Sequence, residues 1–296
     1  MIKPLLKTLR PKQWTKNLFV FAALVFDGKL FQIEPLTRTV AGFVLFCLLS
    51  STIYIVNDLV DIEKDRQHPV KRYRPLASGQ LSPQVAIIAA MGIGLVCLPL
   101  AFWLEPLFGA IALGYVILML AYSFILKNIV IIDVLTIAAG FVLRVGAGVA
   151  LVHVERFSPW LYVCTTLLAL FLAVGKRRHE LFLLQDNANS HRSILSEYNM
   201  NLVDEIISIL SATTIMAYCL YTFSAPNLPS NHLMMLTIPF VLYGLFRYLY
   251  LIHVKNEGGA PEDIAVKDKP LIAALGLWGL AVVLVLYSGN LARFFR

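Results

Sequence analysis

The chain has 296 residues, of which 58% are hydrophobic and only 15% are charged, and its mean hydropathy is +0.74. Soluble domains carry about 25% charged residues, so the composition excludes an ordinary soluble protein and indicates one that lies in lipid. The net charge of +7 suits nucleic acid, but the basic residues lie in short loops between apolar runs, where membrane orientation explains them better. We therefore expect no nucleic-acid partner.

Nine apolar segments follow one another along the chain, most of them close to the roughly 20 residues that cross a membrane as a helix. In chain order they are 17–33, 37–56, 83–103, 106–126, 130–151, 158–175, 204–223, 233–253 and 270–289. The first is the least regular, because Asp27, Lys29 and Gln32 interrupt its end. A helix satisfies its own backbone hydrogen bonds in lipid, and the sequence shows no strand-like alternation. The predicted fold is therefore all-α: a polytopic membrane helix bundle of about nine transmembrane helices.

The Lys and Arg residues predict how this bundle is oriented. One side of the membrane collects 18 of the 25, from the N-terminus, the turn at Lys127 and the loops 57–82, 176–203 and 254–269. Basic residues favour the cytoplasmic side, so we expect an inner-membrane protein whose N-terminus and long loops face the cytoplasm. No linker separates two soluble parts, and residues 1–296 are expected to form a single transmembrane domain.

An acidic row consisting of Asn57, Asp61 and Asp65 follows the second apolar segment. On one continued helix these residues share a face, about 6 Å apart at each step. Carboxylates at this spacing repel each other, and Mg²⁺, which prefers carboxylate oxygens, water and substrate phosphates, compensates for that repulsion. We predict that the three residues bind Mg²⁺ and are catalytic, because ionisable groups at a membrane boundary are costly without a role. The alternative is a solvated acidic face at a helix end.

A basic loop follows the acidic row, with Lys71, Arg72 and Arg74 placed between two prolines. A site for a phosphorylated substrate needs a metal that bridges the phosphates and basic side chains that take the remaining charge. The three basic residues are therefore predicted to bind substrate. Their alternative role is to attach the loop to anionic lipid.

The stretch that contains both features resembles the first aspartate-rich motif of the UbiA superfamily. It reads Asn57-Asp58-x-x-Asp61-x-x-x-Asp65, followed by Arg74-Pro75-Leu76-x-Ser78-Gly79. The resemblance extends over essentially the whole chain, because the number of helices and the placement of the loops also fit. It implies an intramembrane enzyme that binds a diphosphate through Mg²⁺.

Two further segments resemble one branch of that superfamily, the decaprenyl-phosphate phosphoribosyltransferases. They read Leu9-Arg10-Pro11-Lys12-Gln13-Trp14-Thr15-Lys16-Asn17 and His68-Pro69-x-Lys71-Arg72-x-Arg74-Pro75. The branch implies transfer of 5-phosphoribose from phosphoribosyl pyrophosphate (PRPP) to a polyprenyl phosphate. Lys16 is then a substrate-binding residue. The alternative is that its segment is a plain anchor at the membrane interface.

The loop 176–203 departs from the pattern of the prenyl-diphosphate users, which carry a second Asp-x-x-x-Asp motif there. This chain has Lys176-Arg177-Arg178-His179-Glu180 instead. Positive charge suits PRPP, which carries a 5-phosphate besides its diphosphate, and it equally suits the phosphate of the lipid acceptor. Lys176, Arg177 and Glu180 are therefore predicted to bind substrate. The alternatives are a Lys176–Glu180 pair one helical turn apart and a plain orientation signal.

By the same resemblance, Tyr122 and Lys127 at the end of the fourth segment belong to the cytoplasmic site. Lys127 would bind phosphate, and Asp133 would bind metal or orient Lys127. The alternative is a snorkelling Lys127 paired with Asp133. Arg144 lies deep in the fifth segment among small residues that permit close helix packing. A buried arginine needs a partner, and we assign Arg144 to substrate binding with a structural role as the alternative.

Three functions remain open from the sequence alone. The first is a Mg²⁺-dependent transferase that uses PRPP and a polyprenyl phosphate within the lipid membrane. It needs no general base, because a phosphate monoester with a second pKa of about 6 is already ionised at neutral pH. The second is a UbiA-type prenyltransferase that moves a prenyl group from a prenyl diphosphate to an aromatic or lipid acceptor. The third is a transporter or lipid-binding protein without chemistry, because intramembrane charges also mark transport routes.

Overall fold

The computed structural model of the chain describes residues 2–68, 70–154, 159–186, 193–226, 228–257, 264 and 267–294. Throughout these residues the chain forms helices, turns and connecting segments, and none of them is a strand. The predicted all-α fold is therefore confirmed. The chain divides into two compact units: unit 1 is Met1–Leu24 with Gln32–His153, and unit 2 is Val25–Phe31 with Val154–Arg296.

Eight helical segments in the described part of the chain are long and apolar enough to cross a membrane. Unit 1 contributes α3 (Ile33–Val60), α5 (Pro83–Leu104), α6 (Pro106–Phe124) and α7 (Ile132–Val152). Unit 2 contributes α8 (Pro159–Asp186), α9 (Met200–Ser224), α10 (Ile238–His253) with the short 3₁₀ helix η5 (Leu233–Thr237), and α12 (Lys269–Phe294). They coincide with eight of the nine predicted segments, and the chain is a multi-pass membrane protein.

Shorter elements connect these helices. They are α1 (Ile2–Thr8), α2 (Ala22–Phe26), α4 (Ile62–Gln67) and the 3₁₀ helices η1 (Pro11–Phe21), η2 (Lys71–Tyr73), η3 (Leu126–Asn128) and η4 (Ser193–Glu197).

The predicted first segment, 17–33, is not one regular helix. Its first part belongs to η1, a 3₁₀ helix of 11 residues, and only α2 is α-helical before the chain turns into α3. Runs of 3₁₀ helix longer than 3–4 residues are uncommon. This one follows Arg10, whose backbone is left-handed (φ 53°, ψ 61°), and it packs against α3 and α7. Tertiary contacts therefore stabilise a segment that composition alone predicted as a spanning helix.

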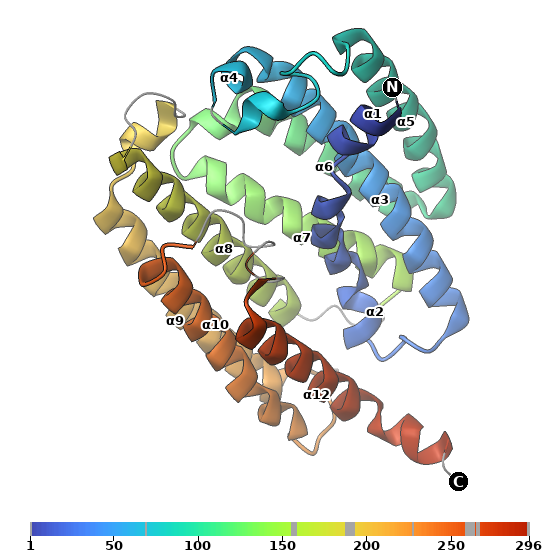
Figure 1. The fold of residues 1–296 in the computed structure, drawn as a ribbon. Helices are drawn as coiled ribbons and strands as arrows, with labels where there is room; N and C mark the ends of the chain where they lie inside the picture. The colour runs from blue at the N-terminus through green and yellow to red at the C-terminus, as the bar shows by residue number, and fades with distance from the viewer. Residues whose placement is uncertain are drawn as a thin grey trace. The chain divides into compact units, whose positions relative to one another are not determined.

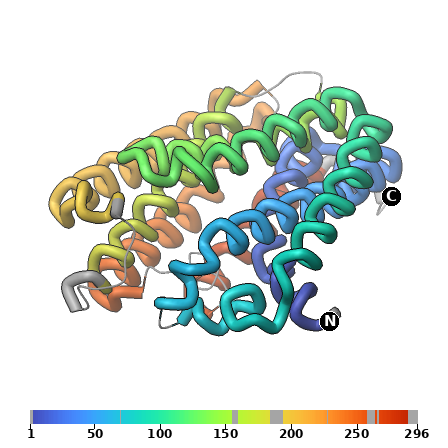
Figure 2. The backbone as a smooth tube through the Cα atoms, turned by 90° about the horizontal axis from the view of Figure 1, so that it is seen from above, coloured from blue at the N-terminus to red at the C-terminus, as the bar shows by residue number. Residues whose placement is uncertain are grey.

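In unit 1, α3 packs against α5, α6 and α7, and α5 also packs against α6 (Figure 1). The second view likewise shows α3 beside α5 (Figure 2). The unit has an apolar core in which Phe46, Phe108 and Leu151 are fully buried. A second apolar cluster, in which Ile55 packs with Leu76 and Leu81, fixes the end of α3, where the acidic row begins.

Gly148 of α7 allows η1 to approach that helix closely. A Cβ atom at this position would lie 2.0 Å from the carbonyl oxygen of Val20. No side chain fits at that distance, so the contact requires glycine. The small residues that predicted close packing in this segment therefore serve the docking of η1.

In unit 2, α8 packs along α9, and α10 packs along α12 (Figure 1). The Tyr218 hydroxyl lies 2.6 Å from Thr237 Oγ1 and accepts a hydrogen bond of 2.7 Å from the indole N–H of Trp278. These bonds join α9, η5 and α12. Asn199 begins α9, because its side-chain oxygen accepts the Leu202 N–H at 2.8 Å and so satisfies a free donor of the first turn.

Candidate active site

The acidic row keeps its one-turn spacing but bends in the middle. The Asp61 N–H donates to the carbonyl of Asn57 at 3.1 Å, and the Asp65 N–H donates to the carbonyl of Asp61 at 2.8 Å. Asp61 itself leaves the helical region (φ −97°, ψ 8°), so that α3 ends at Val60 and α4 begins at Ile62. The straight helix face predicted from the sequence is therefore wrong, and Asp65 belongs to a separate short helix.

Asp58, the neighbour of the row, binds two arginines. Its side chain is 2% exposed, and Oδ1 accepts a hydrogen bond from Arg10 and another, of 3.0 Å, from Arg74 Nη1. The same nitrogen of Arg74 also donates to Asp65 Oδ2 at 2.6 Å. Two carboxylates and two guanidinium groups thus neutralise one another, and they join the N-terminal segment, α3, α4 and the basic loop.

Asp61 has a different partner, Lys127 of η3. The Lys127 ammonium donates to Asp61 Oδ1 at 2.8 Å, and the two side chains are only 6% and 15% exposed. The predicted alternative, in which Lys127 pairs with Asp133, is therefore wrong. Asp133 is fully buried in the first turn of α7, where a carboxylate is favoured by the helix dipole.

The turn between Lys127 and Asp133 is strained. Ile131 has φ 68° and ψ −42°, and the Ile132 N–H donates to the carbonyl of Val130 at 2.8 Å across it. This is a γ-turn with positive φ, a conformation that is rare and costly for a β-branched residue. Such strain persists only where surrounding structure fixes it, and it is common at functional sites.

The three residues of the basic loop lie in different surroundings. Arg74 joins the acidic row, Lys71 is half-buried, and Arg72 is exposed. The Arg72 guanidinium donates to the hydroxyl of its neighbour Tyr73 at 2.8 Å and lies 4.9 Å from that ring. Tyr122 is half-buried at the end of α6. The structure therefore brings Arg74 and Lys127 to the acidic row, and it leaves Arg72 facing solvent.

Arg144 is bound entirely by groups of the protein. Nε donates to Asn17 Oδ1, Nη1 to the carbonyl of Gly140 and Nη2 to the Tyr115 hydroxyl, each at 2.8 Å. The guanidinium also lies 4.7 Å from the centre of the Tyr115 ring, which is favourable for a cation. These contacts fix η1 to α7 and favour the structural alternative for Arg144. Its assignment to substrate stays a prediction.

Lys16 lies on η1 between two fixed points. On one side the Trp14 indole N–H donates to Ser51 Oγ at 3.0 Å. On the other side the buried Asn17 binds Arg144 and donates to Ser50 Oγ at 3.1 Å. The backbone that carries Lys16 is therefore held firmly against α3, while its predicted contact with substrate stays a prediction.

The basic cluster of α8 belongs to unit 2. Arg177 is 1% exposed and pairs with Glu180 one turn later, and Lys176 is half-buried. Arg178 donates to Asp204 Oδ1 and to the carbonyl of Ile252, both at 2.7 Å. The role of Lys176, Arg177 and Glu180 in substrate binding stays a prediction, whereas Arg178, which the sequence did not single out, stabilises the end of α10.

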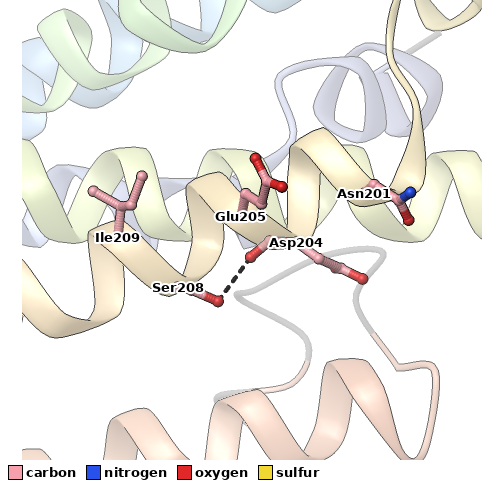
Figure 3. A pocket seen from close by; sticks show the side chains of 5 residues that line it. All are labelled: Asn201, Asp204, Glu205, Ser208 and Ile209. Carbon is pink, nitrogen blue, oxygen red and sulfur yellow. Dashed lines mark hydrogen bonds between the residues drawn. The ribbon is translucent and has the colours of Figure 1, made fainter.

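A surface hollow of about 620 Å³ lies on α9 in unit 2. Figure 3 shows its five labelled residues along this one helix, with the Ser208 hydroxyl donating to the carbonyl of Asp204 at 2.9 Å. The lining residues are Asn201, Asp204, Glu205, Ser208 and Ile209. None of them is a predicted site residue, so this hollow does not mark the predicted site.

The oxygen atoms of the acidic row suit Mg²⁺. Asp61 uses Oδ1 for Lys127 and Asp65 uses Oδ2 for Arg74, so each carboxylate keeps a second oxygen outside its ion pair. With the amide oxygen of Asn57 they supply the hard donors that Mg²⁺ prefers. Among the described residues, no three His, Cys, Asp or Glu side chains converge as metal ligands. Mg²⁺ commonly takes only one or two carboxylates from the protein and keeps water and substrate phosphate as its other ligands, and the free oxygens of Asp61 and Asp65 suit that pattern.

Eight membrane-length helices in the described part of the chain, and a partly buried cluster of carboxylates and cations beside the end of α3, define a multi-pass α-helical membrane protein with an ionic site. The model of the UbiA prenyltransferase family matches residues 18–262, and the chain belongs to this family. The resemblance seen in the sequence is thereby confirmed, and the chain is a transferase.

Relatives and solved structures agree with this family. The chain is 32% identical to a decaprenyl-phosphate phosphoribosyltransferase of Corynebacterium glutamicum, over 96% of this chain and 86% of that protein. It is also 32% identical to the protein of that name from Mycolicibacterium smegmatis, over 95% and 93%. Its fold is similar to that of a UbiA homolog from Archaeoglobus fulgidus bound to DMAPP and Mg²⁺, with a TM-score of 0.72 and 21% identity over 95% of this chain and 99% of that chain.

Proposed function

We propose that the chain transfers 5-phosphoribose from PRPP to a polyprenyl phosphate, with release of pyrophosphate and dependence on Mg²⁺. The observation that carries this proposal is the similarity to the two decaprenyl-phosphate phosphoribosyltransferases, which extends over at least 95% of the chain. The ionic site of unit 1 supports it, because carboxylates for a metal and cations for phosphate lie side by side there.

In the proposed reaction an oxygen of the lipid phosphate attacks the anomeric carbon of the ribose. The bond from that carbon to the diphosphate breaks, and pyrophosphate leaves. Asn57, Asp61 and Asp65 would hold Mg²⁺, which when bound supplies positive charge to the leaving group. Arg74 and Lys127 neutralise further charge on the diphosphate, where electrostatic stabilisation contributes most to catalysis.

The remaining predicted residues have supporting roles in this proposal. Lys16, Lys71 and Arg72 bind the phosphates of the donor, and Tyr122 orients the donor through its hydroxyl. Lys176 and Arg177 bind either the 5-phosphate or the lipid phosphate, as the sequence suggests, and Glu180 contributes to substrate binding by holding Arg177. Residues 1–296 act as one catalytic domain of the cell membrane, with its active site on the cytoplasmic side.

The donor decides between the two enzymatic functions. Purified protein in lipid vesicles is given polyprenyl phosphate together with an aromatic acceptor, and either labelled PRPP or a labelled prenyl diphosphate, with and without Mg²⁺. We expect label from PRPP in the lipid fraction, pyrophosphate in equal amount, and on the order of 10³-fold less of both products from the Asp61→Asn variant. Label from the prenyl diphosphate, with none from PRPP, would replace the proposal by a prenyltransferase.

The prenyltransferase remains the second candidate for a specific reason. The solved structure with a similar fold is a UbiA homolog bound to DMAPP, and the family takes its name from prenyl transfer. Against it stands the basic segment at Lys176, where prenyl-diphosphate users carry acidic residues. A transporter without chemistry would yield neither labelled product in the same assay.

A further inference from the structure

Lys127 and Asp61 form an isolated ion pair within the site. The two residues are 66 positions apart in the chain, and the ammonium lies 2.8 Å from Asp61 Oδ1. Within the described part of the chain, Asp61 is the side-chain partner of Lys127. Because both side chains are largely shielded from water, the loss of one charge leaves the other poorly compensated. Lys127 therefore needs an anion in its surroundings at all times.

Arg74, the other cation at the row, is held differently. One of its nitrogens donates to Asp65 and also to Asp58, whose side chain is 2% exposed in α3. If a metal ion takes Asp65, Arg74 still has Asp58 as a partner and stays in place. Within the described residues, the carboxylate that pairs with Lys127 is that of Asp61, with no second one comparable to Asp58. The two cations should therefore respond differently when a metal ion reaches the row.

We propose that Lys127 is a counter-ion that passes from Asp61 to the diphosphate of the donor when the metal ion binds. This inference rests on the proposed function, because it takes Asp61 as a metal ligand. A divalent ion and an ammonium group that share one carboxylate repel each other strongly in a site of low dielectric. When diphosphate is absent, the repulsion from Lys127 therefore weakens the binding of the metal ion. A diphosphate oxygen gives Lys127 a new partner and removes that opposition.

The local structure permits such a transfer without a change of fold. A lysine carries its charge on a flexible four-carbon chain, so the ammonium can change partners while the backbone stays still. The backbone at Lys127 lies in η3, and the strained turn at Ile131 connects it to α7. The lysine therefore has a fixed base and a movable charge.

A thermodynamic consequence follows from this exchange. Metal and diphosphate should bind cooperatively, and each should raise the affinity of the other by the same factor, because binding linkage is reciprocal. Lys127 is the source of the coupling: it opposes the metal when diphosphate is absent and favours the complex when diphosphate is present. The enzyme then takes up metal together with its donor rather than beforehand.

The test measures binding of Mn²⁺, used as a probe for Mg²⁺, by electron paramagnetic resonance on purified protein in detergent. Titrations are made with and without inorganic pyrophosphate, and the binding of Mn²⁺ to free pyrophosphate is subtracted. For Lys127→Met we expect the affinity for Mn²⁺ alone to rise on the order of tenfold. The enhancement by pyrophosphate should fall by a similar factor.

Three variants control this measurement. Lys127→Arg keeps the charge and should retain most of the wild-type coupling. Arg38→Met removes one cation from the Arg38–Glu105 pair (2.7 Å) at the opposite end of α3, and it should bind Mn²⁺ as the wild type does. Asp61→Asn should weaken Mn²⁺ binding with and without pyrophosphate. Thermal unfolding of each variant checks that it is folded.

Two results would overturn the inference. In the first, Lys127→Met binds Mn²⁺ alone no more tightly than the wild type, although it is folded. In the second, Asp61→Asn leaves Mn²⁺ binding unchanged. Transfer of label from PRPP by the wild-type enzyme is measured separately, so that the inference can fail while the proposed function stands. The reverse outcome, cooperative binding without transfer from PRPP, would sink the proposed function alone.

Discussion

Asp58 illustrates how neighbouring residues of one motif take different roles. It directly follows Asn57, so on a helix it points away from the face that Asn57 shares with Asp61. There it is buried and accepts hydrogen bonds from Arg10 and Arg74. The motif therefore contains a predicted metal-binding face and a second face that fixes the surrounding arginines, and each face can be tested by a single substitution.

For the buried face, Asp58→Asn removes the charge shared by Arg10 and Arg74. We expect the free energy of unfolding to fall by about 2–4 kcal/mol, since two cations lose their common partner. The matched control is Glu63→Gln, which breaks the exposed Arg66–Glu63 pair (2.8 Å) and should cost less than about 1 kcal/mol. Both are measured by chemical unfolding in detergent. Equal losses in the two variants would contradict the role assigned to Asp58.

For the metal-binding face, Asp61→Asn keeps the shape of the side chain and removes its charge. We expect turnover with PRPP to fall by on the order of 10³-fold, because a preorganised electrostatic contact to the leaving group is lost. Initial rates at saturating Mg²⁺ measure the effect. The control is Asp204→Asn, which makes the same chemical change in unit 2, at the partner of Arg178. Its turnover with PRPP should fall far less than that of Asp61→Asn.

At the scale of elements, the turn between α6 and α7 combines strain with a predicted substrate-binding residue, Lys127. Ile131→Gly removes the penalty that positive φ imposes on a β-branched side chain. We expect the free energy of unfolding to rise by about 0.5–1 kcal/mol, while turnover falls because Lys127 is held less firmly. The control is Ile132→Gly in the first turn of α7, which should destabilise by about 1 kcal/mol. A loss of stability in both variants would argue against strain at Ile131.

The start of α12 depends on a second pair of charges. Arg247 donates to both carboxylate oxygens of Asp268, at 3.1 and 2.8 Å, and Asp268 Oδ1 accepts the Leu271 N–H at 2.9 Å. The hydrogen bond from Arg247 holds the pKa of Asp268 below its usual range. Asp268 therefore both caps the helix and ties it to α10.

This lowered pKa predicts a pH dependence. A carboxyl group that ionises more readily in the folded chain stabilises the fold above its unfolded-state pKa of about 3.9, and that stabilisation is lost as the pH falls through the lower folded-state pKa. We expect the unfolding temperature of the wild type to exceed that of Arg247→Gln near neutral pH, and the difference to shrink as the pH is lowered towards about 3. A difference independent of pH would rule out the ionised pair as its cause.

The sequence predicted elements well where composition decides them. The eight long helices follow from apolar runs of membrane length. The segment 17–33 was mispredicted because its apolar residues match a spanning helix, whereas the buried contacts of Asn17 with α3 and α7 hold it as η1. Those contacts join residues far apart in the chain, and the pattern of a single segment does not contain them.

The site was predicted in part for the same reason. The one-turn spacing of Asn57, Asp61 and Asp65 could be read from the sequence because it is a local property, while the role of these residues in metal binding stays a prediction. The spacing did not reveal that Arg10 and Arg74 meet at Asp58, since the contact between Arg10 and Asp58 bridges 48 residues. Arg10 belongs to the N-terminal motif and Asp58 to the aspartate-rich motif, but neither motif alone indicates that the two residues meet. The bend of the backbone at Asp61 was also missed.

At the scale of the whole molecule, the proposed orientation can be tested with cysteine labelling. The structure places Cys47 and Cys97 in buried positions and shields Cys164 and Cys219 in part, so a membrane-impermeant maleimide should give a low background. Arg72→Cys introduces a thiol at an exposed position of the basic loop. We expect labelling in inside-out vesicles and little in intact spheroplasts. The opposite pattern would place the acidic row outside the cell.

The bond between Arg144 and Asn17 also bears on how the protein is made. The two residues are 127 positions apart, so the ribosome must synthesise three long helices after η1 before its partner emerges. Until then Asn17 has no guanidinium to bind, and when α7 enters the bilayer its positive charge needs a ready acceptor. The N-terminal segment therefore cannot complete its docking until α7 has been made, and we expect a substitution at either residue to leave more of the newly made chain open to quality-control proteases.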